Sequence, residues 1–141
     1  MASAKAECEA LMNEALPFAQ RMLAEHGEFH PYGLVMKSNG EIAYVGAYDG
    51  RELPPSQNLI DLLEAGFQRE AAAGEYKATA LVCDVLVIPP GGDMKRDAIS
   101  VALDHRCDDY SVIVYFPYLR TAGVVTLRDP FAHEGQRKIF L

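Results

Sequence analysis

The chain has 141 residues, half of them apolar and 23% charged, and its net charge is −7. A chain of this length is expected to form one domain with a core that needs no disulfide or metal. The acidic balance argues against nucleic acid and anionic membranes as partners, because both require clustered Lys and Arg. No apolar run approaches the ~18 residues of a membrane span.

The first residues of the chain and the number of cysteines indicate the cellular compartment in which the protein is found. Acidic residues occur where a signal peptide would have an apolar stretch. Three cysteines are a small and odd number, which is typical of reduced thiols. We therefore expect a cytoplasmic protein.

Two segments predict amphipathic helices. Apolar residues recur at three- and four-residue steps through residues 3–26, and again through residues 56–73. Pro17 removes one helical hydrogen bond, so we expect a kink or two abutting helices in the first segment.

A β-hairpin is predicted between the helices. Asn39-Gly40 separates two alternating apolar runs, which favours a two-residue type I′ turn. Pairing residue 38 with residue 41 then places Val35, Ile42 and Tyr44 on one face. Two helices do not cover both apolar faces of such a sheet, so we expect these residues and Tyr115 to form an interface with a second subunit.

The following segment predicts three further strands joined by short turns, which makes them antiparallel. The first is rich in β-branched residues and the other two alternate in polarity. Pro117 is expected to end regular pairing or to mark an edge. The strands are residues 77–88, 97–105 and 110–118; residues 124–127 could add a short strand within a looser tail, residues 119–141.

The predicted fold is a single α+β domain over residues 1–141, with a five-stranded antiparallel sheet and two packed helices in α-β-β-α-β-β-β order. This order resembles that of roadblock and profilin-like domains, and residues 33–43 (GLVMKSNGEIA) are similar to the first roadblock hairpin. The resemblance covers residues 4–118 and implies the strand order 2-1-5-4-3. The chain also resembles uncharacterised bacterial domain families. Neither resemblance implies an activity.

Three polar residues are candidates for a ligand site. Asp84 lies inside an apolar strand, where a carboxylate needs a partner. His105 belongs to the polar turn at residues 104–109, and His30 lies between aromatic residues. The structural alternatives are a solvated turn for His105 and a packed junction for His30. The turn offers two ligand types with no second pair, so no metal is expected, and no motif indicates a cofactor.

Three functions are compatible with these observations. The leading hypothesis is a non-catalytic interaction or scaffold domain that acts as a homodimer and has a possible protein partner. The alternative is a small-molecule binding protein or small enzyme, with Asp84, His105 and His30 around a pocket beside the sheet. The third is an acidic regulatory partner of a basic protein, suggested by the net charge.

Overall fold

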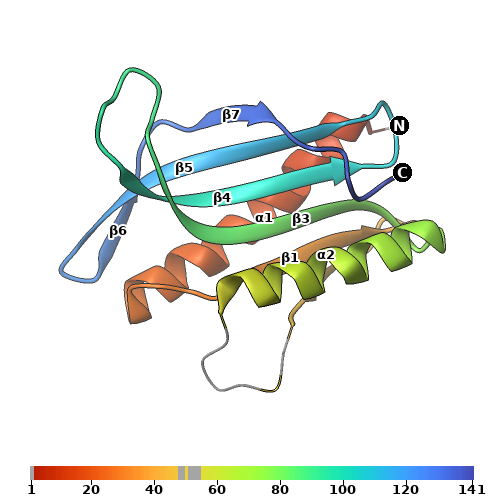
Figure 1. The fold of residues 1–141 in the computed structure, drawn as a ribbon, viewed down its shortest axis with the longest axis horizontal. Coiled ribbons are helices and arrows are strands. Elements are labelled where there is room, and N and C mark those ends of the chain that lie inside the picture. Colours follow the sequence, from red (N-terminus) through yellow and green to blue (C-terminus); the bar gives the residue numbers. More distant parts are fainter. Residues whose placement is uncertain (1, 48–49, 51–54) are drawn as a thin grey trace.

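The computed structural model describes residues 2–47, 50 and 55–141. In this part the chain is an α+β protein with two helices and a seven-stranded antiparallel sheet (Figure 1). The elements, in chain order, are α1 (Ala4–His26), β1 (Tyr32–Lys37), β2 (Ile42–Val45), α2 (Ser56–Ala72), β3 (Tyr76–Val87), β4 (Arg96–His105), β5 (Ser111–Thr121), β6 (Val124–Leu127) and β7 (Phe131–Glu134).

The sheet corrects the predicted strand number and order. The strands run β2-β1-β3-β4-β5-β6, with β7 also paired to β5, so β3 lies beside β1 where the resemblance implied the last strand. Short connections join β3, β4, β5 and β6, and each strand pairs with the one before it. The predicted extra strand at residues 124–127 is confirmed as β6, whereas β7 lies in the segment that we expected to be loose.

The β1–β2 hairpin differs from the prediction by one residue in register. Met36 pairs with Ile42, and the N–H of Lys37 donates to the carbonyl of Glu41 at 2.8 Å. The turn therefore contains three residues, and its last residue, Gly40, adopts a φ of +92°. A one-residue shift reverses which side chains of β2 face each side of the sheet.

α1 is one uninterrupted helix, so the expected alternative of two abutting helices is wrong. The Ser3 hydroxyl accepts a hydrogen bond from the Ala6 N–H at 3.1 Å, and Gly27, at a φ of +79°, ends the helix. Pro17 lies inside it and is exposed. The carbonyl that loses its helical partner belongs to Asn13, which is also exposed, so solvent is available to it.

The main core lies between α1 and one face of the sheet. α1 packs across β1, β3, β4 and β6. Arg120 on β5 donates from Nε to the carbonyl of Leu23 at 2.8 Å and so satisfies the C-terminal end of α1. The fully buried residues of this core include Leu11, Ala15, Leu23, Leu34, Val82, Ile99 and Val101.

β5 continues through Pro117, where an end or an edge was expected. Pro117 pairs with Ala98 on β4. On the other side of β5, residues 112–115 pair with β7 and residues 118–121 pair with β6. Pro117 therefore lies between the two paired stretches, where a missing N–H disturbs the sheet least.

Candidate functional site

α2 leaves part of the second sheet face uncovered. It packs on β1 and β3, with the buried ring of Phe67 against Gly33. A Cβ on Gly33 would lie 2.5 Å from that ring, so the glycine permits the close approach of helix and strand. Within the described part of the chain, no helix covers β4 and β5 on this side (Figure 1).

A groove occupies this uncovered region, and we call it the sheet-face groove. Its cavity volume is about 410 Å³, which lies in the range of small-molecule sites. α2 forms one wall, β3 and β4 form the floor, and β5 with the chain after β7 forms the other wall. The lining includes Ile60, Glu64, Phe67, Leu81, Cys83, Val85, Ser100, Ala102, Asp104, Ser111, Ile113, Tyr115 and residues 135–139.

The groove is hollow because β4 alternates in side-chain size. Successive residues of a strand point to opposite faces. The large residues of β4 face α1, and the small or acidic residues face the groove. The large residues are Ile99, Val101 and Leu103; the others are Ser100, Ala102 and Asp104.

Aromatic side chains extend the wall that β5 provides. Tyr115 on β5 stacks on Phe131 of β7, with ring centroids 5.0 Å apart and ring planes 19° apart. His133 meets both rings edge-on, with centroids 5.6 Å away. Of these three rings, only that of Tyr115 belongs to a residue lining the groove, and Phe131 and His133 pack beside it.

The end of the groove beside the C-terminal segment is polar. Asp104 Oδ1 accepts a hydrogen bond from the Ser111 hydroxyl at 2.8 Å, and that hydroxyl accepts from the N–H of Arg137 at 3.2 Å. Lys138 pairs with Glu64 on α2 at 2.5 Å. The C-terminal segment, which lies in the tail that we expected to be looser, is thus held against both α2 and β5.

Burial raises the pKa of two groups in the groove, Asp104 and Cys83. It raises the pKa of Asp104, and the hydrogen bond from Ser111 opposes this only in part. Burial also raises the pKa of Cys83 to about 12, so its thiol is protonated at neutral pH.

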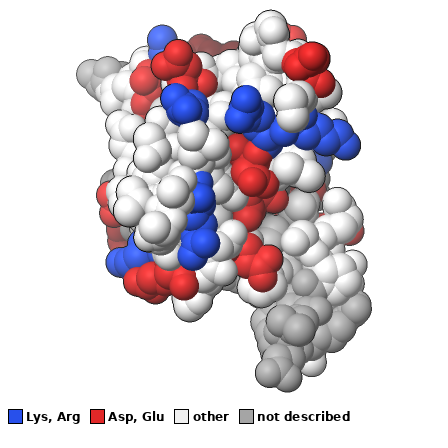
Figure 2. Space-filling view, turned by 90° about the vertical axis from the view of Figure 1, so that its left-hand side faces the viewer, with Lys and Arg blue, Asp and Glu red and all other residues white. Residues whose placement is uncertain are grey.

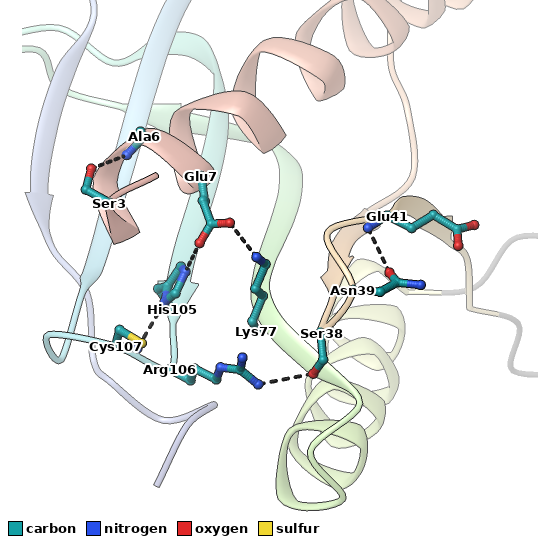
Figure 3. A network of polar contacts seen from close by, with 10 residues as sticks. All are labelled: Ser3, Ala6, Glu7, Ser38, Asn39, Glu41, Lys77, His105, Arg106 and Cys107. Carbon is teal, nitrogen blue, oxygen red and sulfur yellow. Dashed lines mark hydrogen bonds and ion pairs between the residues drawn. The ribbon is translucent and has the colours of Figure 1, made fainter. Parts of the chain in front are cut away.

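His105 lies on the opposite face of the sheet, in a network with α1 (Figure 3). Its Nε2 is 2.9 Å from Glu7 Oε1, and Glu7 Oε2 is 2.6 Å from Lys77 Nζ. Its Nδ1 accepts a hydrogen bond from the N–H of Cys107 at 2.9 Å. Nδ1 is therefore unprotonated, and the neutral ring donates from Nε2 to Glu7. Both ring nitrogens serve to hold the start of α1 against the turn after β4.

The other two predicted ligand residues lie elsewhere. Asp84 accepts a hydrogen bond from the Tyr118 hydroxyl at 2.8 Å. His105 pairs across the sheet with Ala78, six residues before Asp84 on β3, which separates the two sites by about 20 Å. His30 is exposed, and the part of the chain that the structure describes gives it no side-chain partner. The three residues do not form one site.

The end of the molecule beyond Asp84 presents both signs of charge. Burial raises the pKa of Asp84, and the nearby carboxylates of Asp97 and Glu28 add to the rise. Figure 2 views this end and shows acidic side chains near its centre with basic side chains on either side. This face is therefore not uniformly acidic, whereas a uniformly acidic surface would be expected of a partner of a basic protein.

The four predicted interface residues are divided between the two sheet faces. Val35 is buried beneath α2, and Tyr115 lines the groove. Ile42 and Tyr44 face α1 instead, because of the shifted hairpin register. Tyr44 is 52% exposed and stacks near Tyr32 at the sheet edge. One continuous interface through all four residues is therefore not present.

The polar end of the groove was missed by reasoning from the sequence. A signal for Asp104 existed, since the alternation of β4 places it on one face with Ser100 and Ala102. No local pattern brings Ser111 and Arg137 to it, because they meet through β7 and the chain that follows.

No protein-family model, curated protein or solved structure matches the chain. Neither helix in the described ranges combines the length and hydrophobicity that a membrane-spanning helix requires. Among the described residues, no three His, Cys, Asp or Glu side chains are arranged to hold a metal ion.

Proposed function

We propose that the protein is a non-catalytic binding domain and that the sheet-face groove holds a small organic ligand. The uncovered sheet face with its cavity of about 410 Å³ is the observation that supports this. Apolar walls with a few polar groups at one end are typical of ligand sites. The proposal keeps the pocket beside the sheet that the sequence suggested, but it uses different residues.

The chemistry of the lining favours binding over catalysis. A nucleophile must be activated by a base or by a lowered pKa. Burial raises the pKa of the Cys83 thiol, which opposes activation. The described lining of the groove includes no histidine: His133 lies next to Tyr115 but is not among the lining residues, and His105 is on the other face with both ring nitrogens occupied.

Filling the groove tests the proposal. Ala102→Phe places a ring on the groove floor, whereas Ala132→Phe places the same ring at an exposed position of β7. A fragment library screened by backbone amide NMR is expected to shift the signals of Leu81 and Ile113 in the wild type and in Ala132→Phe, but not in Ala102→Phe. Absence of any fragment that shifts these signals, or unchanged shifts in Ala102→Phe, would contradict the proposal.

A homodimeric interaction domain is the second candidate, supported by a region that adjoins the groove at Leu86. The β3–β4 hairpin extends past both helices (Figure 1) and exposes large apolar side chains. Leu86, Ile88 and Met94 are 63%, 53% and 67% exposed, and exposed apolar patches are typical of protein interfaces. Native mass spectrometry is expected to give twice the 15.5 kDa chain mass, and Met94→Glu is expected to return it to one chain. A wild-type protein of one chain mass would exclude this candidate.

A further inference from the structure

The polar end of the sheet-face groove narrows the class of ligand. Given that the groove is the binding site, we propose that its ligand is a compact aromatic amine, with its ammonium group at Asp104 and its ring along the apolar wall. The proposal rests on three features: a carboxylate with spare hydrogen-bonding capacity, a neighbouring lysine that is already paired with a glutamate, and apolar and aromatic side chains that line the same groove.

Asp104 can accept a further hydrogen bond. Its Oδ1 accepts from Ser111, and that hydroxyl in turn accepts from the N–H of Arg137. No other hydrogen bond to this carboxylate occurs among the described residues, and the side chain lines the cavity. An ionised carboxylate accepts at about four positions, so Asp104 presents a free oxygen to the groove.

The charge of Asp104 is only weakly compensated. Lys138 lies close enough to lower the pKa of Asp104, but its ammonium is paired with Glu64, which has the opposite effect. The backbone of Arg137 contacts Ser111, while the residue itself is exposed. Burial therefore dominates and disfavours the ionised form. A ligand cation at Asp104 would supply the missing countercharge and a charge-assisted hydrogen bond.

The remaining part of the groove suits a ring. Tyr115 lines the groove, and its ring is held by stacking on Phe131. Aromatic rings favour offset or edge-to-face contact with a further ring. Leu81 and Ile113 add apolar contacts from the floor and the wall. The cavity of about 410 Å³ is near the lower limit for ligand sites, which favours a compact molecule.

A carboxylate ligand fits this site less well. Arg137 and Lys138 also line the groove, but Lys138 is paired with Glu64, and an anion beside Asp104 would meet the charge of that carboxylate. Like charges close together in a partly buried site repel strongly. The expected order of affinity is therefore amine, then neutral analogue, then acid.

Three probes of nearly equal shape separate these possibilities. They are 1-naphthylmethylamine, 1-naphthylmethanol and 1-naphthoic acid, each titrated into the wild-type protein at pH 7 by calorimetry. The amine is expected to bind at least tenfold more tightly than the alcohol. This preference should disappear in Asp104→Asn and persist in Asp93→Asn, a matched change in the exposed turn between β3 and β4.

The outcomes distinguish this inference from the function on which it rests. Equal binding of amine and alcohol, a preference for the acid, or an amine preference that persists in Asp104→Asn would overturn the amine inference while leaving the groove as a binding site. Failure of all three probes to bind would overturn the amine inference, and absence of any fragment hit in the NMR screen would overturn the binding function as well. Loss of binding of every probe in Ala102→Phe would locate the amine preference in the groove.

Discussion

The two faces of the sheet are built from the same strands, yet only one of them is covered by a helix over most of its strands. α1 has 23 residues and spans roughly 35 Å, whereas α2 has 17 residues and spans roughly 25 Å. Among the described elements, α1 packs across β1, β3, β4 and β6, while the main sheet contacts of α2 are with β1 and β3. On the face under α1, β4 contributes the large residues Ile99, Val101 and Leu103; on the groove face it contributes Ser100, Ala102 and Asp104.

We therefore expect the face under α1 to contribute mainly to the stability of the fold and the groove face mainly to ligand binding. Large buried side chains contribute most of the free energy of folding. Small residues and a partly buried carboxylate contribute little, and Asp104 opposes folding when it ionises. Residues that cost stability and line a cavity are the ones expected to act on a ligand. Three experiments test whether the two faces differ in this way.

The largest expected effect comes from truncating a leucine on each face. Leu34 is fully buried under α1, so Leu34→Ala should lower the free energy of unfolding by about 2–5 kcal/mol. Leu81 lines the groove and is only partly buried, so Leu81→Ala should cost about 1 kcal/mol. Urea denaturation followed by circular dichroism measures both, and equal losses would contradict the contrast between the faces.

A smaller effect is expected from the network beneath α1. Hydrogen bonding to Lys77 is the main cause of the lowered pKa of Glu7, and His105 adds to it. Glu7→Gln should cost about 1–3 kcal/mol at pH 7, and exposed Glu14→Gln should cost almost nothing.

The pH dependence of this loss follows from the sign of the pKa shift. A lowered carboxyl pKa stabilises the folded state above the ordinary value of 4.5, and this contribution is lost as the pH falls through the folded value. The difference between wild type and Glu7→Gln should therefore shrink below about pH 4.5. A difference that is constant from pH 7 to pH 3 would contradict the role of the charge.

The smallest expected effect, with the opposite sign, comes from the groove. Asp104 has a raised pKa, so the folded protein holds this proton more tightly than the unfolded chain, which ionises near 3.8. Ionisation of Asp104 therefore lowers stability as the pH rises. Asp104→Asn should leave the free energy of unfolding at pH 7 unchanged or slightly higher, since the amide oxygen can still accept from Ser111. Clear destabilisation would show that Asp104 supports the fold.

The elements themselves could be predicted because their signals are local. Helical periodicity gave α1 and α2, and the alternating or β-branched runs gave the strands to within a few residues, including β6. One error concerned the turn between β1 and β2. Asn39-Gly40 favoured a two-residue turn, but the hairpin adopts a three-residue turn. Because strands have a period of two, that single residue moved Ile42 and Tyr44 to the other face.

The sequence by itself determined an α+β chain with two amphipathic helices, antiparallel strands and a β4 strand with one large and one small face. Each of these follows from side-chain periodicity within a short stretch. Only the tertiary structure decided that α2 stops short of β4, that β7 pairs with β5, and that Ser111 and Arg137 meet at Asp104. These contacts join residues far apart in the chain. A local sequence pattern does not specify which distant residue will pair with a strand or bind a carboxylate.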